Sequence, residues 1–301
     1  MTSPTSIYTC RYCRLQSDFS AGALTACPHC GAPVDVAAAV SRSGWEKQPP
    51  IADMARIQFG QSTVQIEGKF VPTADFRLAG GERIYFSHHT LLWTEPSVQM
   101  GTTAMAGGWN RMRAGLPLVM LEAGASGHIA LSEDAPGEIL ALPLQHGQSV
   151  IVREHRFLAA TTNVGYTWQQ SNVWITTGSG NEQETHYPMG VFLDLFGAQD
   201  GPGLLLLHSP GNTFIRDLGP GETICIQPSS LLYKDPGVGM QLHIEYPNSG
   251  GVQFGFGRNY SYRNVWLRMW GPGRVAVQSV FERPEESGYI TSCSPATTMS
   301  W

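Results

Sequence analysis

The sequence predicts an all-β protein. Its 301 residues include 34 glycines and 20 prolines, whereas only 14% are charged. This balance favours short strands joined by tight turns over long helices. Seven runs of strand length have period-two character; they are 63–70, 139–144, 150–152, 191–196, 223–226, 265–270 and 275–277. No long amphipathic helix is recognised, and one short helical turn is expected at 107–115.

Internal repetition is the second observation that favours this fold class. Three segments join a glycine-containing turn to a glutamate and an apolar strand; they are Leu78–Ile84, Asp134–Ile139 and Leu218–Ile224. Further similarities follow at Thr90–Val98, Arg156–Val164 and Ser230–Val238, and at 115–124, 189–197 and 264–273. A β unit of roughly 65–85 residues therefore occurs about three times. Such units can bury one core around a pseudo-threefold axis, each covering the edge of its neighbour.

The glutamate of each turn is expected to have a structural role. Glu82, Glu138 and Glu222 each precede an apolar strand. A carboxylate at this position can accept hydrogen bonds from N–H groups of the turn. Because the glutamate recurs in every unit, it is better explained as part of the scaffold than as part of an active site, which is usually asymmetric.

Four cysteines near the N-terminus have the spacing of a metal site. Cys10 and Cys13 form one CxxC pair, and Cys27 and Cys30, followed by Gly31, form the second. Four thiolates can close a tetrahedral Zn²⁺ site, which is structural rather than catalytic because no coordination position stays open. Disulfides within the pairs would be strained and unusual in a reducing compartment. A single iron on the same thiolates is an alternative that the spacing leaves open.

The chain is predicted to divide into four parts. The zinc ribbon occupies residues 6–33 and is too small to fold without its metal. Residues 34–52 mix small residues, serine and a proline pair, which is typical of a linker. The β domain follows at 53–283 and a C-terminal tail at 284–301. The ribbon is interpreted as a stabilising or docking appendage.

Composition and charge bear on location and partners. No apolar run approaches the length of about 18 residues that a transmembrane helix needs. The first residues lack the features of a secretory signal, and only Cys225 and Cys293 lie outside the CxxC pairs. A soluble cytoplasmic protein is therefore expected. The net charge of −5 provides no overall attraction for nucleic acid.

No catalytic constellation is recognised, and enzymatic activity is not expected. The sequence lacks GxSxG and HExxH motifs and a phosphate-binding loop. His88 and His89 are adjacent, so in a strand they would point to opposite faces. A metal-dependent barrel enzyme would need histidine and glutamate side chains to converge, and it is the least favoured alternative. Its candidate ligands are His128, Glu154, His155, His208 and His243.

One segment has the texture of a nucleic-acid-binding surface. Between 254 and 263, aromatic residues alternate with glycine and arginine, and single-stranded bases stack on such side chains. The residues are Phe254, Phe256, Arg258, Tyr260, Tyr262 and Arg263. Contacts between repeats or with another protein use the same residue types. Given the negative net charge, protein contact or self-association is favoured.

The motifs together resemble a known family. They are the Pro-Gly-Glu turn with its strand, the segment 107–115 before a strand, and the pattern Gly-apolar-Phe-Leu-x-Leu-x-Gly at Gly190–Gly197. In this order they resemble the altered-inheritance-of-mitochondria twenty-four (AIM twenty-four) family over about residues 53–283. The resemblance implies a domain similar to the tryptophan RNA-binding attenuation protein (TRAP-like), a short double-stranded β-helix. It implies no established enzymatic activity, and the polar segment Gln169–Tyr187 and the zinc ribbon are additions to the family pattern.

The expected function is that of a non-enzymatic scaffold or protein-interaction protein. It would assemble with itself as a homo-oligomer or dock a protein partner, and it would carry structural Zn²⁺. The alternatives are a single-stranded nucleic-acid-binding protein that uses the TRAP-like domain and the ribbon, and the metal-dependent barrel enzyme.

Overall fold

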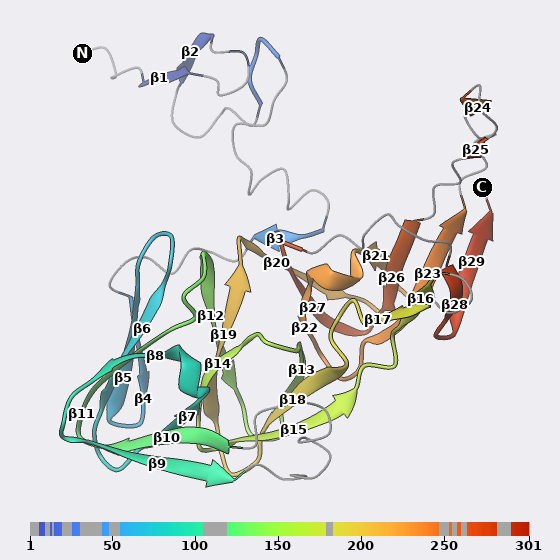
Figure 1. The fold of residues 1–301 in the computed structure, drawn as a ribbon. Coiled ribbons are helices and arrows are strands. Elements are labelled where there is room, and N and C mark those ends of the chain that lie inside the picture. The colour runs from blue at the N-terminus through green and yellow to red at the C-terminus, as the bar shows by residue number, and fades with distance from the viewer. Residues whose placement is uncertain are drawn as a thin grey trace.

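The structure, a computed structural model, is built almost entirely of β-strands (Figure 1). It describes residues 6–9, 13, 15–19, 26–30, 44–47, 55–104, 119–178, 183–246, 253–254, 258–259, 264–281 and 290–300. Helical segments in these ranges are the two 3-10 turns η1 (His88–Thr90) and η3 (Pro228–Ser230). The predicted all-β class is confirmed, and each of the seven predicted runs contains a strand. The helical turn expected at 107–115 lies outside the described residues.

Three consecutive units of six strands form the body of the molecule. Unit 1 spans 73–132, unit 2 spans 137–210 and unit 3 spans 213–278. The strands of unit 1 are β6 (Thr73–Leu78), β7 (Ile84–Phe86), β8 (Leu91–Thr94), β9 (Val98–Ala104), β10 (Val119–Ala125) and β11 (Gly127–Ser132). Those of unit 2 are β12 (Gly137–Leu144), β13 (Ser149–Arg153), β14 (Phe157–Thr161), β15 (Val164–Gln170), β18 (Phe192–Ala198) and β19 (Gly203–Pro210). Those of unit 3 are β20 (Thr213–Leu218), β21 (Thr223–Ile226), β22 (Leu231–Lys234), β23 (Gly239–Tyr246), β26 (Asn264–Trp270) and β27 (Gly273–Gln278).

The same pairing pattern occurs in all three units. The sixth strand pairs with the first and third strands, and the fifth strand pairs with the second and fourth strands. All of these pairs are antiparallel. The pairing of third and sixth strands is interrupted at one residue in each unit, which is Leu92, Leu158 or Leu232. The units are therefore three copies of one folding pattern.

A tight turn joins the first and second strands of each unit. The fourth residue donates its N–H to the carbonyl of the first: Glu82 to Ala79 (3.3 Å), Gln148 to Gln145 (2.9 Å) and Glu222 to Gly219 (3.1 Å). The third residue is a glycine at positive φ in every copy, at Gly81, Gly147 and Gly221. An L side chain rarely adopts this conformation, so the turn selects glycine.

This geometry corrects the predicted position of the second repeat. The sequence placed it at Asp134–Ile139, around Glu138. The corresponding turn instead lies at 145–148, where Gln148 replaces the glutamate, and Glu138 lies at the start of β12. The similar segments Thr90–Val98, Arg156–Val164 and Ser230–Val238 do contain the third strands, and the fourth strand begins at or directly after the last residue of each segment. Those at 115–124, 189–197 and 264–273 contain the fifth strands.

Further strands extend these sheets or, as β16, β17 and β28, form a small separate sheet. A hairpin of β4 (Ala55–Phe59) and β5 (Ser62–Glu67) adds to β6, and β3 (Glu46–Lys47), from the predicted linker, pairs with β20. Within 169–187, β16 (Ile175–Thr177) pairs with β17 (Glu184–His186). The predicted C-terminal tail contributes β28 (Ile290–Cys293), which pairs with β16, and β29 (Ala296–Ser300), which pairs with β23. Parts of the predicted linker and tail thus belong to the sheets of the β domain.

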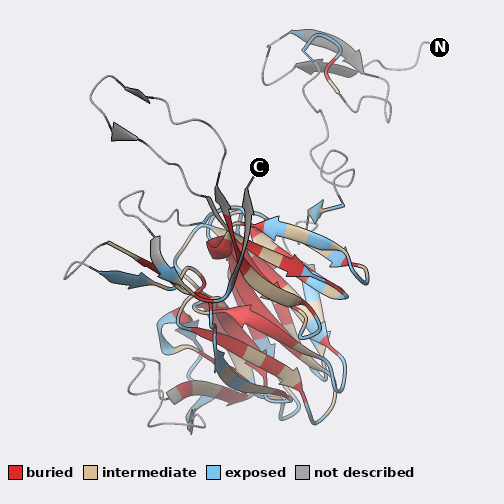
Figure 2. Ribbon diagram, turned by 90° about the vertical axis from the view of Figure 1, so that its right-hand side faces the viewer, coloured by how far each residue is buried: buried red, intermediate tan, exposed pale blue. Residues whose placement is uncertain are grey.

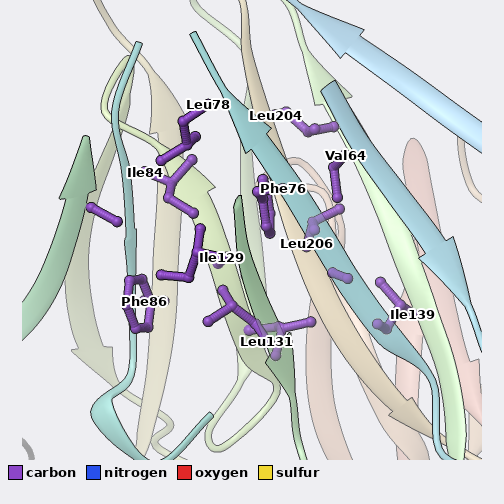
Figure 3. Packing of buried hydrophobic residues seen from close by; sticks show 14 of the residues in the cluster. Val64, Phe76, Leu78, Ile84, Phe86, Ile129, Leu131, Ile139, Leu204 and Leu206 are labelled. Atoms are coloured by element: carbon purple, nitrogen blue, oxygen red, sulfur yellow. The ribbon is translucent and has the colours of Figure 1, made fainter. Parts of the chain in front are cut away.

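Buried residues line the interior of the β body (Figure 2), and three core clusters each combine residues of neighbouring units. One cluster combines Phe76 and Ile129 of unit 1 with Leu206 of unit 2 (Figure 3). A second combines Val152 of unit 2 with Tyr233 of unit 3. Since no unit buries its apolar strands alone, the three units stabilise one another as in other repeat proteins. None of the helical segments in the described ranges has the length and apolar character of a membrane span.

Candidate functional site

The N-terminal cysteines converge in the described part of the chain. β1 (Ser6–Thr9) and β2 (Gln16–Phe19) form a hairpin, and Cys13 lies in its connection. The thiols of Cys13, Cys27 and Cys30 lie within 4.8 Å of one another, with Cys27 buried and Cys30 exposed. Cys10, the fourth predicted ligand, lies outside the described residues.

The spacing of these thiols fits a metal ion better than a disulfide. Cys13 Sγ and Cys27 Sγ are 3.8 Å apart. Zinc–sulfur bonds of ~2.3 Å in a tetrahedron place neighbouring sulfurs ~3.8 Å apart, whereas a disulfide needs ~2.05 Å. Cys13, Cys27 and Cys30 form no disulfide. The three thiols can therefore hold a metal ion. A tetrahedral ion bound by three thiolates has one further coordination position, which the predicted fourth thiolate of Cys10 could occupy.

The histidines and Glu154 proposed for a barrel metal site are distributed over different units. His128 lies in β11, where Nδ1 is 3.3 Å from Asp75 Oδ1, and His208 and His243 lie in β19 and β23. His155 and Glu154 are chain neighbours, with Nε2 and Oε1 3.8 Å apart. Among the described residues, the cysteine cluster is the one group of three or more His, Cys, Asp or Glu side chains with metal-ligand spacing. The convergence that this least favoured alternative requires is not observed among the described residues.

Histidines do gather near one acidic group at the junction of units 1 and 2. His89 Nε2 lies 3.6 Å from Glu133 Oε1, and the charges of His155 and Arg156 also act on this carboxylate. Burial raises the pKa of Glu133, and the neighbouring His89, Arg156 and His155 oppose the shift. The arrangement is a half-buried ion-pair cluster, and its histidines are exposed.

His208 belongs to a repeated structural position. It follows the last core residue of the sixth strand of unit 2, and Ser132 and Gln278 occupy the same place in units 1 and 3. All three side chains are buried, and each has a hydrogen-bond contact with a main-chain carbonyl; His208 Nε2 lies 3.1 Å from Ala135 O. Burial lowers the pKa of His208 to about 4, so its ring is neutral near pH 7.

The three predicted carboxylates bind main-chain N–H groups, but only Glu222 binds one in its own turn, as predicted. Glu82 Oε1 accepts from Gln61 N–H at 3.0 Å, and Glu222 Oε2 accepts from Gly219 N–H at 3.0 Å. These hydrogen bonds are the leading cause that lowers the pKa of each carboxyl. Glu138 accepts from Thr213 N–H at 3.0 Å, although it lies outside the repeated turn.

The predicted aromatic surface lies mostly outside the described residues. β24 (Gln253–Phe254) and β25 (Arg258–Asn259) form a short hairpin that places Phe254 opposite Arg258. Phe256, Tyr260, Tyr262 and Arg263 are not described. The nucleic-acid interpretation of this segment stays a prediction.

The sequence analysis missed an exposed apolar strand edge in unit 1. β8 pairs with β11 and with no other described strand. Leu92 and Trp93 on this strand are 58% and 44% exposed, and the Trp93 ring stacks against His128. The same sequence pattern occurs in the buried strand β22, so alternation alone gives no signal of the difference.

Comparisons with known proteins agree with the predicted family. The profile of the family described as "Mitochondrial biogenesis AIM24" matches residues 64–280. An X-ray crystal structure of protein SPYM3_0169 from Streptococcus pyogenes has a TM-score of 0.52 and 19% identity, and covers 73% of this chain and 94% of that chain. That likeness shows a common fold, and no curated protein sequence matches the chain. Because the family profile spans more than two thirds of the 301 residues, the resemblance found in the sequence is confirmed and the chain belongs to the AIM24 family.

Proposed function

We propose that this protein is a non-enzymatic scaffold that assembles with itself or docks a protein partner. The observation that carries the proposal is the array of three similar units, in which β8 of the first unit and β21 of the last unit lie at sheet edges among the described strands. Uncovered strand edges readily accept another strand, so proteins retain them where pairing is useful or protect them by other means. The exposed side chains of Leu92 and Trp93 on β8 favour the first case, an edge retained for pairing with another strand.

The buried and turn ionisable groups described above also support a scaffold. Glu82 and Glu222 hold backbone turns, and the buried ring of His208 lies against a carbonyl at the end of a strand. Equivalent positions in other units perform the same structural task with different side chains. Groups with such roles stabilise the β domain and need no substrate to explain their placement.

The cysteine cluster is proposed to hold structural Zn²⁺. Three thiols within 4.8 Å and the position of Cys10 in a CxxC motif support a closed four-thiolate site. Elemental analysis of purified protein should find one zinc per chain. If the analysis finds one iron per chain instead, the four-thiolate site is supported but its metal is iron and not zinc. The cytoplasmic location expected from the sequence is part of this proposal.

The scaffold proposal is tested by the size of the metal-loaded full chain in solution. Sedimentation velocity over a wide concentration range should show species larger than one chain, increasing with concentration. A strict monomer at every concentration, together with no specific protein partner in affinity capture from its source, would overturn the scaffold. Neither outcome of the sedimentation experiment affects the test of the zinc site by elemental analysis.

A further inference from the structure

The geometry points to a specific contact: β21 of one copy pairs antiparallel with β8 of a second copy. This inference rests on the proposed scaffold function and identifies its partner as another copy of the same chain. The contact joins the last unit of one molecule to the first unit of the next. It repeats, between molecules, the junction that already joins the units within one molecule.

Two internal junctions define the rule. The second strand of unit 1 pairs with the third strand of unit 2, as β7 with β14. The second strand of unit 2 pairs with the third strand of unit 3, as β13 with β22. Among the described strands, two lack this junction: β21, the second strand of unit 3, and β8, the third strand of unit 1.

The register of the two internal junctions is the same. Counting from the turns, Phe86 and Val152 are equivalent, and they lie opposite Ala159 and Tyr233, which are also equivalent. The next pairs, Tyr85 with Ala160 and Ile151 with Lys234, agree as well. Because both internal junctions pair equivalent residues of the second and third strands, the register belongs to the repeated unit. It can therefore be applied to a junction between two molecules.

Applied to β21 and β8, the same register specifies each opposed pair. Ile226 lies opposite Trp93 of a second copy, and Cys225 lies opposite Thr94 of that copy. β21 keeps its pairing with β26, and β8 keeps its pairing with β11. Two sheets of different molecules thus become one continuous sheet.

Exposure of the third strands supports this use of β8. Leu158 and Leu232 are fully buried at the internal junctions, whereas the equivalent Leu92 is 58% exposed. Tyr233 is 1% exposed, whereas the equivalent Trp93 is 44% exposed. A junction at β8 would bury the apolar side chains of Leu92 and Trp93, which are exposed to solvent in the single chain.

The second strands show the same contrast. Tyr85 and Ile151 are buried at the internal junctions, whereas the equivalent Cys225 is exposed. Neither β8 nor β21 contains a charged residue or a proline, the devices that commonly block pairing at an edge. Since β8 and β21 are different surfaces, the contact is heterologous and generates a chain of molecules or a closed ring.

A single introduced thiol tests the register. Opposed residues of antiparallel strands have Cα atoms ~4.5–5.5 Å apart, within the range that a disulfide spans. In the zinc-loaded full chain, Thr94→Cys should form a disulfide with the native Cys225 when a diamide oxidant accepts the two electrons and two protons. The product is identified by peptide mapping of a mixture of ¹⁴N- and ¹⁵N-labelled protein. Peptides that combine both labels are expected, because the bond joins two copies.

The controls separate this contact from other modes of assembly. Thr94→Cys/Cys225→Ser should lose the cross-link, and Thr102→Cys, at an exposed position of β9, the next strand in the chain, should not gain it. Circular dichroism of each variant establishes that the fold is retained. If the protein assembles in sedimentation but forms no mixed-label bond between Thr94→Cys and Cys225, the edge contact is refuted while the scaffold stands. A bond formed only within one copy would also refute it.

Discussion

The third strands of the three units occupy equivalent positions and pair in the same way with the sixth strand, but they differ in burial. β8, β14 and β22 all follow a short turn, and all are interrupted at an equivalent leucine opposite the sixth strand. β14 and β22 each pair with a strand of the preceding unit and are buried, whereas β8 pairs with no strand of another unit in the described ranges and is exposed. Burial in this protein therefore depends on the position of a strand in the array as well as on its own sequence.

The comparison also shows what the first unit retains. Leu92 is a leucine like the equivalent Leu158 and Leu232, and Trp93 lies beside it, although both side chains are exposed at a strand edge. A terminal repeat usually carries a polar outer face that makes the end of the array soluble. An apolar outer strand instead indicates a contact, which the inferred head-to-tail pairing supplies.

The largest expected effect contrasts an internal and a terminal leucine. Leu158→Ala should lower the free energy of unfolding by about 3 kcal/mol, because it opens a cavity in a closed core. Leu92→Ala should lower it by no more than about 0.5 kcal/mol in dilute protein, where the edge is solvated. Denaturant unfolding of both variants measures the difference. Equal losses would show that β8 is already buried in the single chain.

The buried His208 distinguishes unit 2 from the other units by its response to acid. Its pKa is about 4 in the folded protein and ~6.5 when unfolded, so the unfolded state binds more protons between these values. The resulting stability is fully present above pH 6.5 and is lost as the pH falls toward 4. Between pH 7 and pH 5 the loss should be about 2 kcal/mol. His208→Gln should remove this part of the pH dependence in unfolding titrations, and an unchanged profile would contradict the assignment.

The repeated turn should give a smaller and more uniform effect. Gly221→Ala places a side chain at φ +78° with no atom within 4 Å, so backbone strain is the main cost, about 1 kcal/mol. Gly219→Ala, two residues earlier in the same turn and without positive φ, is the matched control and should cost less than about 0.5 kcal/mol. Thermal or denaturant unfolding compares the two. Similar costs at both positions would mean that the turn conformation does not select glycine.

The smallest effect on the β domain is expected from the metal site. Cys27→Ser should release the metal and unfold residues 6–33, because such a small module depends on its ion. The β domain should retain its strand signal in circular dichroism and its unfolding midpoint. Elemental analysis provides the metal readout. Loss of the whole fold would show that the ribbon is an integral part of the array.

Much of the architecture was accessible from sequence patterns. Alternating runs predicted the strands, and recurring turns predicted about three units. The second unit was misplaced because Gln148 provides the turn amide where units 1 and 3 have glutamate, while Gly137 and Glu138 imitate the motif in a strand. A hydrogen bond of the turn can be made by either side chain, so residue identity alone did not locate it.

The exposed edge could not be found in the same way. Leu91–Thr94 and Leu231–Lys234 have nearly the same apolar pattern, and only the order of the units shows that one of them lacks a covering neighbour. For the metal site, by contrast, a local CxxC spacing was sufficient to predict the convergence of Cys13, Cys27 and Cys30.

The central claim, that the two ends of the array fit each other, is tested most directly by mixing two blocked variants. Trp93→Lys places a charge on β8, and Cys225→Lys places one on β21. Sedimentation should show that each variant alone associates at least tenfold more weakly than the parent protein. Their mixture has one intact β21 and one intact β8, so it should form a one-to-one dimer that grows no further. A mixture that stays as monomeric as its components, or variants that assemble like the parent protein, would contradict the account.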